Sequence, residues 1–396
     1  MYSFHSLKTM YPYAAPMLAL AASEIVLAQD RAALRFKTDG SFKLSIFEDL
    51  HFGEAEDLDW GPKQDLYGQK VMNAVLDHED QQLVVLNGDL ITGENTYLHN
   101  STDYVNEIVK PLIERNRVWA STYGNHDSDF NLSRSNILAR EQTWPNSLTR
   151  QDVDTPTSGV SNYYLPVYSA DKRKRCPELI LWMFDSRGGH FYQQLDDEGN
   201  RVGQPSWVDQ TVVDWFQVTK SKLRKQYGKD IPSLGFVHIP VSAMLAYQQS
   251  QGPQPHYEPG INDDVPLDQQ KQDTPFMEAL LDTPGMMALF SGHDHGNDWG
   301  FRWNSQLPGM NLTGNGLCLF FSRHSSYGGY GTWTRGSRQI LVTEESLQTL
   351  SFETWNRLET GEISGRIMVD ESYGHTYYPR VNDTHTSLDD SPLEPQ

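Results

Sequence analysis

The sequence predicts an α/β fold on the basis of two observations. Short apolar runs, which are typical of buried strands, alternate along the chain with segments whose apolar residues recur at helical spacing. The joins between these segments are short, and strand–helix–strand order with short joins indicates a sheet covered by helices. With 396 residues, 38% of them hydrophobic, the chain can bury the core of one large domain or two small ones.

The first half of the chain carries three strands and two helices of this pattern. Strands are expected at residues 42–47, 83–86 and 117–122, and helices at residues 64–80 and 103–116. The run at 83–86 is apolar on both faces, as in a strand buried between two layers. Residues 129–160 hold few apolar runs and are expected to form a long excursion over the surface.

The second half continues the alternation and then becomes polar. Strands are expected at residues 162–168, 179–184, 234–237, 286–290, 317–321, 339–343 and 350–354. One helix is expected at residues 207–226, with Ser206 as its N-cap. Residues 250–273, rich in Gln, Pro and Asp, are expected to be a loop. From residue 359 to 396 the polar sequence predicts a poorly packed tail.

The charge and the cysteines exclude two classes of protein. A net charge of -20 argues against nucleic-acid binding through a broad basic surface, and the basic run at residues 172–175 is expected to be a solvated loop. The chain contains no Cys-x-x-Cys spacing, so a thiolate zinc site is excluded. Whether Cys176 and Cys318 pair is left open, as is the oligomeric state.

The N-terminal residues have features of a targeting segment. Residues 1–28 combine a weakly positive start at Lys8 with a short apolar stretch and small residues, which favours secretion or vacuolar delivery. A cytoplasmic location is the alternative, and residues 29–358 form the expected domain. Four glycosylation sequons are compatible with secretion: Asn100, Asn131, Asn311 and Asn382. No other stretch has about 18 consecutive apolar residues, so no membrane span is predicted.

Polar residues follow several expected strands at the point where each strand ends. Asp49 and His51 follow the strand at 42–47, and side chains two residues apart in an extended chain point the same way. Oxygen and imidazole side chains follow four later strands: Asp89, Asn125 and His126, His238, and His293 and His295. Because ligands of α/β sheets bind at the carboxyl ends of the strands, these side chains are expected to converge.

The size of this set indicates two metal ions. Eight convergent side chains exceed the three protein ligands of a catalytic zinc site, and they fit two metals about 3.5–4 Å apart. Asp89 is the natural bridge, because it follows a central strand and offers two oxygens. Gly88, Gly124 and Gly292 are expected to allow sharp turns at the strand ends. For any single residue the alternative is a structural histidine, or a turn-forming Asp89 or Asn125.

The order of these motifs resembles that of the calcineurin-like metallophosphoesterases. The resemblance covers roughly residues 42–345 and is carried by Asp49-x-His51, Gly88-Asp89, Gly124-Asn125-His126-Asp127, Val237-His238 and Gly292-His293-Asp294-His295. The run at residues 323–331 is similar to the purple-acid-phosphatase-like branch found in fungi and plants. The resemblance implies a four-layer α-β-β-α sandwich of two mixed sheets flanked by helices, with a dinuclear site at one edge.

The resemblance also implies a role for each residue. The first metal would be held by Asp49, His51 and His295, the second by Asn125, His238 and His293, and both by the bridging Asp89. His126 would face the substrate phosphate and the leaving group, with Asp127 orienting its imidazole. Arg323 and His324 are candidates for substrate binding, and Arg187 is a weaker one. The alternative for Arg323 and His324 is a surface or core-edge pair.

At two positions the chain departs from true purple acid phosphatases. Those enzymes carry Gly where His51 stands and Tyr where Thr92 stands. The tyrosinate that gives the purple colour is therefore missing. Its absence disfavours a ferric first metal and favours two divalent ions, namely Mn²⁺, Fe²⁺ or Zn²⁺.

Together these residues predict a metal-dependent phosphatase that hydrolyses phosphate monoesters, with phosphoproteins among the candidate substrates. A water that bridges two cations loses a proton at a pKa of roughly 7, and the hydroxide would attack phosphorus in line. A phosphodiesterase or nucleotide hydrolase on the same site is the alternative, since substrate choice lies in the loops at residues 52–65, 129–160 and 250–273. The alternative of another class is a non-catalytic scaffold with this fold.

Overall fold

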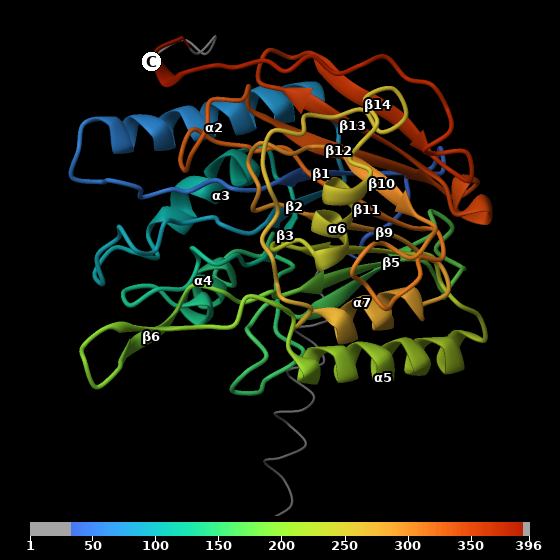
Figure 1. Cartoon of the computed structure of the whole chain (residues 1–396), viewed down its shortest axis with the longest axis horizontal. Coiled ribbons are helices and arrows are strands. Elements are labelled where there is room, and N and C mark those ends of the chain that lie inside the picture. Colours follow the sequence, from blue (N-terminus) through green and yellow to red (C-terminus); the bar gives the residue numbers. More distant parts are fainter. Residues whose placement is uncertain (1–32, 391–396) are drawn as a thin grey trace, which may run out of the picture. The chain divides into compact units, whose positions relative to one another are not determined.

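Two six-stranded mixed sheets form the centre of the unit that begins at Leu34 (Figure 1). The computed structural model describes residues 33–390, so the expected signal segment at 1–28 lies outside the described residues. The strand order is β14-β13-β12-β1-β2-β3 in the first sheet and β10-β11-β9-β8-β5-β4 in the second. The prediction of an α/β fold with two mixed sheets is confirmed.

The first sheet has a parallel part and an antiparallel part. Strands β1, β2 and β3 are parallel, and β12, β13 and β14 extend the sheet antiparallel from β1. Their bounds are β1 Ser41–Phe47, β2 Leu83–Asn87, β3 Trp119–Thr122, β12 Gly336–Thr343, β13 Phe352–Leu358 and β14 Ile363–Val369. Leu44 of β1 lies opposite both Leu83 and Ile340, which places an apolar row across the sheet.

The second sheet has a parallel centre with an antiparallel strand at each edge. Strands β5, β8, β9 and β11 are parallel, and β4 and β10 pair antiparallel at the edges. Their bounds are β4 Tyr163–Tyr168, β5 Pro177–Phe184, β8 Ser233–Val237, β9 Met286–Ser291, β10 Gly300–Trp303 and β11 Leu317–Phe321. A separate hairpin of β6 (His190–Leu195) and β7 (Arg201–Gly203) follows β5.

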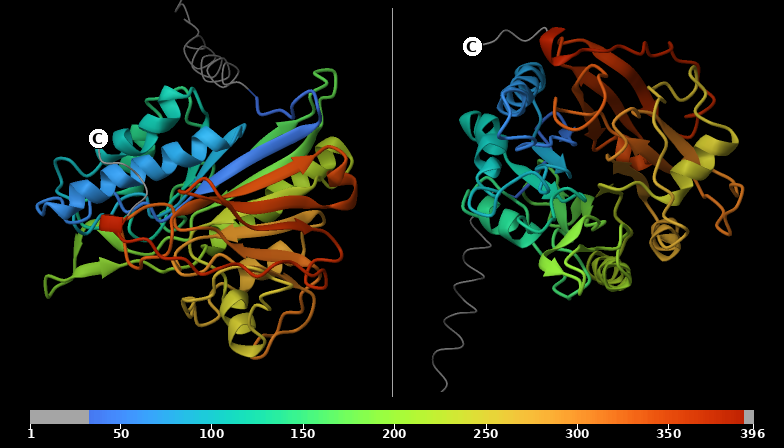
Figure 2. Two further views of the ribbon diagram at one scale, coloured as in Figure 1. Left: turned by 90° about the horizontal axis from the view of Figure 1, so that it is seen from above. Right: turned by 60° about the vertical axis from the view of Figure 1, so that its left-hand side comes forward.

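Helices cover the outer face of each sheet, which completes four layers (Figure 2). The helices are α2 Trp60–His78, α3 Tyr104–Glu114, α4 Arg134–Glu141, α5 Gln210–Tyr227, α6 Ser242–Ser250 and α7 Thr274–Leu281. Met72 of α2 packs in one cluster with Val84 of β2, and Phe216 of α5 lies edge-on to Trp182 of β5. Between the sheets, alternate residues such as Leu44 and Phe236 form a shared core. The predicted α-β-β-α sandwich is therefore present.

The C-terminal segment differs from the expected poorly packed tail. Residues Ile363–Val369 form β14, which pairs with β13, and Ile367 and Val369 are buried in the core between the sheets. Beyond the strand, the buried Tyr373 donates its hydroxyl hydrogen to the carbonyl of Gly300 at 2.7 Å. The overall polarity of this segment hid the alternation of its few apolar residues, which is what a strand at the sheet edge requires.

Three further expectations are corrected. The excursion at residues 129–160 contains α4, whose Ile137 is fully buried, so the segment is only partly superficial. Helix α5 begins at Gln210 and its N-cap is Asp209, whose carboxylate accepts from the Thr211 amide at 3.0 Å; Ser206 is not the cap. The short elements α6, α7, β6, β7 and β10 were not predicted.

The remaining expectations concern the cysteines, the sequons and the membrane. Cys176 and Cys318 are both free thiols. Among the sequons, Asn311 and Asn382 are exposed, whereas the Asn131 amide group donates to the Thr96 carbonyl. None of the helices within residues 33–390 is both long enough and apolar enough to cross a bilayer.

Candidate metal centre

The predicted ligands follow the carboxyl ends of parallel strands from both sheets. β1, β2 and β3 of the first sheet lead into Asp49, Asp89 and Asn125, and β8 and β9 of the second lead into His238 and the His293–His295 turn. The loops after β1 and β2 are joined directly, because the amides of Leu50 and His51 donate to the Asp89 carbonyl at 2.8 and 3.0 Å. The strand ends therefore converge, as the sequence predicts.

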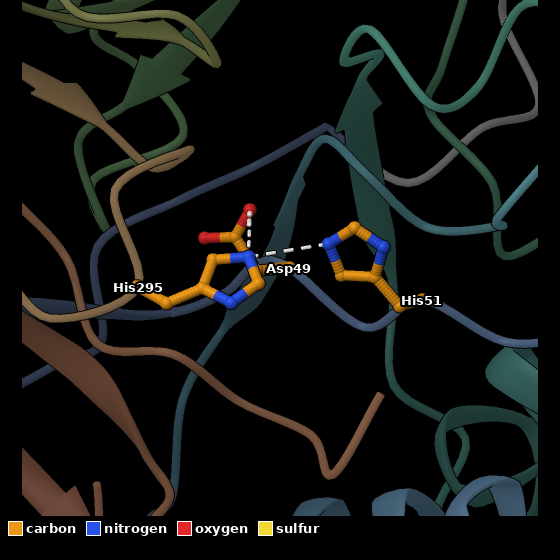
Figure 3. Close-up of side chains that lie close together, drawn as sticks. All are labelled: Asp49, His51 and His295. Carbon is orange, nitrogen blue, oxygen red and sulfur yellow. Dashed lines mark hydrogen bonds and ion pairs between the residues drawn. The ribbon is translucent and has the colours of Figure 1, made fainter. Parts of the chain in front are cut away.

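One group of ligand-type atoms is formed by Asp49, His51 and His295 (Figure 3). All three side chains are buried, and their ligand atoms lie within 4.8 Å of one another. The Nε2 atom of His295 lies 3.2 Å from Nε2 of His51 and 3.7 Å from Oδ1 of Asp49. These are the three residues expected at the first metal.

A second group is formed by Asp89, His238 and His293. The Nε2 atom of His238 lies 2.9 Å from Oδ2 of Asp89. The same Asp89 oxygen lies 3.9 Å from Nε2 of His51 in the first group, so Asp89 stands between the two groups as the expected bridge would. Nδ1 of His293 and Oδ1 of Asn125 are buried without a hydrogen-bond partner among the described residues.

The imidazoles are held so that their free nitrogens face the site. Nδ1 of His238 donates to the Asn87 carbonyl and Nδ1 of His295 donates to the Tyr330 carbonyl, each at 2.9 Å. Because a carbonyl oxygen only accepts, the Nε2 atom of each ring carries the lone pair that a metal needs. Nδ1 of His51 contacts Oγ1 of Thr92 at 3.2 Å. Free imidazole nitrogens, carboxylates and an unpartnered amide oxygen fit a pair of divalent cations.

Burial sets the protonation of these side chains. Burial lowers the pKa of His293 and of His295 to about 3, and it lowers the pKa of His51 well below its usual value. The three rings are therefore neutral at physiological pH, which is the form that binds metal. Burial and the Glu48 carboxylate raise the pKa of Asp49, because two negative charges share one dry site.

The ligand backbone is in the left-handed region at four residues. The φ angles are 53° at Asp49, 51° at His51, 47° at Asp89 and 75° at His293. For residues other than glycine this conformation costs roughly 1–3 kcal/mol, and it persists where the surrounding structure enforces it, often at functional sites. Here the β1 loop is held by its hydrogen bonds to the Asp89 carbonyl, and His293 is held by the hydrogen bond from its amide to the Asp49 carboxylate at 3.2 Å.

Gly88, Gly124 and Gly292 mainly leave room for the side chains that pack against them. The expectation that all three make sharp turns is therefore corrected. Only Gly88 among them has a positive φ, at +93°. A Cβ atom on Gly124 would lie 2.2 Å from Oδ1 of Asp89, and one on Gly292 would lie 2.9 Å from Oε2 of Glu48. The backbone therefore approaches the carboxylates more closely than any side chain would permit.

His126 faces the pocket, but its carboxylate partner is not the predicted one. Nδ1 of His126 lies 2.5 Å from Oε1 of Glu94. Asp127 instead accepts from the backbone amides of Leu90, Ile91 and Gly124 at 2.9, 3.0 and 2.8 Å, so it holds the loops together. Burial opposes the charge on His126, but Asp89 and Glu94 outweigh it and raise the pKa of His126 to about 9.

Arg323 and His324 do not reach the pocket, which contradicts the prediction that they bind substrate. The Arg323 guanidinium is buried and pairs with Oδ2 of Asp298 at 2.6 Å while donating to the Thr334 carbonyl. The ring of His324 lies behind His295, with centroids 4.0 Å apart. Arg187 is likewise engaged, with the Trp207 carbonyl at 2.9 Å. The core-edge alternative is the correct one for Arg323 and His324.

A cavity of about 400 Å³ opens over the two groups. It is lined by His51, Glu54, Asp89, Thr92, Glu94, His126, Asp264, Val265, Leu267, His293, Asp294, His295, Gly329 and Tyr330. Sequence reasoning did not name Glu54, Glu94, Asp264 or Tyr330, although Glu54 and Asp264 lie in two of the loops expected to set substrate choice. Glu94 comes five residues after Asp89, and its nearness to that motif is the one signal that could have indicated it. Tyr330, in the run at residues 323–331, stacks on His295 with centroids 4.0 Å apart.

Two known proteins are similar in sequence to this chain over most of its length. "Probable inactive purple acid phosphatase 29" of Arabidopsis thaliana is 25% identical over 374 residues, which cover 88% of this chain and 90% of that protein. "Phosphatase DCR2" of Saccharomyces cerevisiae is 28% identical over 340 residues, which cover 81% of this chain and 54% of that protein.

The fold and the family agree with these relatives. The crystal structure of a dimetal phosphatase from Danio rerio has a similar fold, with a TM-score of 0.50 and 11% identity, covering 83% of this chain and 98% of that one. The sequence model of calcineurin-like phosphoesterases matches residues 49–297, from the first predicted metal ligand to just beyond the last. That match, on a fold whose strand ends gather two groups of metal-type ligands, places the chain in the calcineurin-like phosphoesterase family.

Proposed function

We propose that this chain is a phosphatase that hydrolyses phosphate monoesters with two divalent metal ions. The observation that carries the proposal is the presence of two adjoining ligand groups, joined by Asp89, beneath one open pocket that His126 also lines. The match to the calcineurin-like phosphoesterases supports the same reaction class.

The ligand set defines what each group would hold. Asp49, His51 and His295 would bind one cation, and Asn125, His238 and His293 the other, with Asp89 shared. When bound, the two cations supply Lewis acidity toward the phosphate oxygens and a nucleophilic water at neutral pH. The neutral state of His51, His293 and His295 makes their nitrogens available without loss of a proton.

His126 supplies the proton that the leaving group needs. Its ring lines the pocket and its side chain is 33% exposed. The Asp89 and Glu94 carboxylates raise its pKa to about 9, so it is protonated at neutral pH. A leaving alkoxide is a strong base, so a proton donated from a positioned imidazolium lowers the barrier, typically by a factor of about 10²–10⁴. Glu94 holds the ring in one orientation while this occurs.

The first test is a metal analysis combined with turnover. The protein should bind about two metal ions per chain, and a chelator should abolish hydrolysis of a chromogenic phosphate monoester. Activity that survives complete removal of metal would contradict the proposal. Comparing monoester with diester turnover after loading with Mn²⁺, Fe²⁺ or Zn²⁺ would separate the proposed reaction from that of a phosphodiesterase.

His126→Ala tests the proton donor. The variant should retain both metals and lose about 10²–10⁴-fold in kcat, with the larger loss for alkyl esters, whose leaving groups need the proton most. His78→Ala is the matched control, because His78 is an exposed histidine on α2 that does not line the pocket. Loss of metal from His126→Ala would show that His126 is a ligand instead.

The alternative of a non-catalytic scaffold is supported only by the names of similar proteins. A plant relative carries the word "inactive" in its name, and this chain is 25% identical to it. All seven predicted ligands and His126 are present here at the strand ends. A scaffold would hydrolyse neither ester class, so the turnover measurement above decides between the two.

A further inference from the structure

Tyr330 contacts one of the predicted metal ligands, His295, through three different groups. Its carbonyl accepts from Nδ1 of His295 at 2.9 Å, and its hydroxyl accepts from the His295 amide at 3.2 Å. Its ring stacks on the imidazole, with centroids 4.0 Å apart and an angle of 9° between the planes. One tyrosine therefore holds both the backbone and the side chain of His295.

These contacts fix which nitrogen of His295 faces the first ligand group. Because Nδ1 donates to a carbonyl, the proton of the neutral ring is on Nδ1 and the lone pair is on Nε2. Nε2 is the atom turned toward Asp49 and His51 (Figure 3). A ring rotated by half a turn would place carbon atoms at both positions, so its orientation decides whether it can bind a metal.

The loop that carries Tyr330 is anchored from below by a buried cation. The guanidinium of Arg335, which is buried, donates to three carbonyls of this loop, those of Ser326, Gly331 and Trp333. Hydrogen bonds from a charged donor are roughly twice as strong as those between neutral groups. The loop is therefore held in place by groups that are not themselves predicted ligands.

The tip of the same loop is fixed against the ligand ring. The Tyr330 hydroxyl, which accepts from the His295 amide, also donates to Asp264, and the Gly329 amide donates to Oε2 of Glu54 at 2.6 Å. A Cβ atom on Gly329 would lie 2.3 Å from Cε1 of His295, so the backbone of the loop lies directly on the imidazole. The loop tip thus leaves the His295 ring little room to turn.

The side chain of Tyr330 is nevertheless half exposed. Its exposed fraction is 50%, and it lines the pocket over the ligand groups. Substitution of an exposed side chain usually costs a fold little. The contacts to His295 can therefore be removed in a variant that still folds.

We propose that Tyr330 is a positioning residue that sets the His295 imidazole in its metal-binding orientation before a metal arrives. The inference rests on the proposed function, because it takes His295 as a ligand of the first metal. A ring that is already held in the binding orientation loses less freedom when it binds, so the affinity of the first ligand group is higher.

The affinity of the first ligand group for zinc is the direct test. In His293→Ala, which lacks a ligand of the second group, Zn²⁺ should bind to the first group, and its affinity is measured by competition with a chromophoric chelator. Adding Tyr330→Ala should weaken binding by about 10- to 100-fold, the range seen when the partner of a metal-binding histidine is lost. Tyr330→Phe keeps the stacked ring and the carbonyl, so it should weaken binding less.

Tyr377→Ala is the matched control, made in the same His293→Ala background. Tyr377 also stacks on a histidine, His256, with centroids 4.7 Å apart and an angle of 11° between the planes. Neither Tyr377 nor His256 lines the pocket or belongs to the two ligand groups. Its substitution should leave the zinc affinity unchanged.

The orientation of the ring can be measured in the metal-free protein, without any measurement of activity. Nitrogen NMR of the histidine rings should show His295 as the Nδ1-protonated tautomer, with the signal assigned from its loss in His295→Gln. In Tyr330→Ala the signal should broaden or split, because the ring is no longer held in one orientation. In Tyr377→Ala it should stay as in the wild type.

The outcomes separate this inference from the proposed function. A zinc affinity and a His295 signal that are both unchanged in Tyr330→Ala would overturn the inference. Unchanged affinity with a lower kcat/KM at saturating metal would also overturn it, because Tyr330 would then act on the substrate. If the wild type bound no metal and hydrolysed no ester, the proposed function would fail, while the His295 signal in Tyr330→Ala would still decide the positioning role.

Discussion

At the scale of single residues, the site is defined by which carboxylate touches which histidine. Glu94 lies 2.5 Å from Nδ1 of His126, whereas the predicted partner, Asp127, accepts three backbone amides. Asp127 is adjacent to His126 in the sequence, but neighbouring side chains diverge, and its carboxylate turns into the loop beneath. Glu94, the residue that contacts His126, therefore belongs to a different loop, the one that follows β2.

Glu94→Gln tests that contact. The amide cannot hold the imidazolium by charge, so kcat for alkyl phosphates should fall about 10- to 100-fold, the range seen when a carboxylate behind a functional histidine is lost. Metal content should not change, and p-nitrophenyl phosphate should suffer less, because its leaving group needs little protonation. The measurement is kcat for the two esters with metal content determined in parallel. An equal loss for both esters would indicate a purely structural role for Glu94.

The sequence predicted where these ligand-type side chains gather because their signal is local. Each of Asp49, Asp89, His238 and His293 lies within two residues of the end of a strand, and buried strands are what hydrophobic patterns locate best. Arg323 follows β11 in the same way, yet it turns inward to Asp298, which no pattern along the chain reveals. Contacts that depend on the packing of distant loops are outside the reach of such patterns.

At the scale of elements, α4 is tied to β3 by one buried carboxylate. Glu141, at the end of α4, accepts hydrogen bonds from Trp119, Ser121, Tyr123 and Thr149 at 3.0, 2.9, 3.0 and 2.7 Å. Burial raises the pKa of Glu141. The strand that delivers Asn125 is thus anchored from its outer side by a network that contacts no substrate.

Glu141→Ala should therefore destabilise the protein without a direct effect on chemistry. Removing the carboxylate leaves four buried donors without an acceptor, and the expected cost is at least about 3 kcal/mol. Glu141→Gln, which keeps one acceptor oxygen, should cost less. Urea unfolding of the two variants measures the difference. Equal stability of the alanine variant and the wild type would show that the network contributes nothing.

A second carboxylate, Asp65 of α2, makes stability depend on pH. Asp65 is 6% exposed and accepts from the Gly53 amide at 3.1 Å, and burial raises its pKa to about 7. The folded protein therefore binds this proton more tightly than the unfolded chain does. Between pH of about 4 and 7 the unfolded state holds fewer protons, so stability falls as pH rises.

Asp65→Asn should remove that dependence. The asparagine carries no charge and can still accept from Gly53, so the variant should lose less stability than the wild type between pH 5 and pH 8. Asp77→Asn on the same helix is the control, since Asp77 is exposed and its variant should keep the wild-type slope. Chemical unfolding at the two pH values measures both. A slope for Asp65→Asn equal to that of the control would contradict the assignment.

The four-layer order of the whole molecule was predicted, and so were the edge strands β3 and β4, but the edge strands β10 and β14 were not. Apolar runs revealed the central strands because these are buried on both faces. The edge strands β10 and β14 and the hairpin of β6 and β7 carry exposed or short segments with weak alternation. Edge strands depend on pairing with a neighbour that is already in place, so their sequences hold less of the information.

The candidate metal centre takes its ligands from the carboxyl ends of strands in both sheets. Asp49, His51 and Asp89 come from the first sheet, and His238, His293 and His295 come from the second, so any metal held by a group spans both. Metal should therefore stabilise the folded protein, by about 4 kcal/mol when its concentration is a thousandfold above the dissociation constant. Thermal unfolding with metal and with a chelator measures the shift. The shift should shrink in Asp89→Ala, and identical melting in both conditions would contradict a metal centre.

Four of the predicted ligand residues have a left-handed backbone conformation, and the strain of that conformation disfavours keeping their side chains. Asp49, His51, Asp89 and His293 occupy backbone positions that glycine tolerates without strain. Relief of roughly 1–3 kcal/mol exceeds the 0.5–1 kcal/mol that glycine typically costs through the greater freedom of the unfolded chain. Replacement by glycine should thus yield a metal-free protein that melts higher than the metal-free wild type. Strain relief favours loss of these four side chains, and the amide hydrogen bonds that Asp49 accepts from His293 and Asp89 accepts from His126 oppose it.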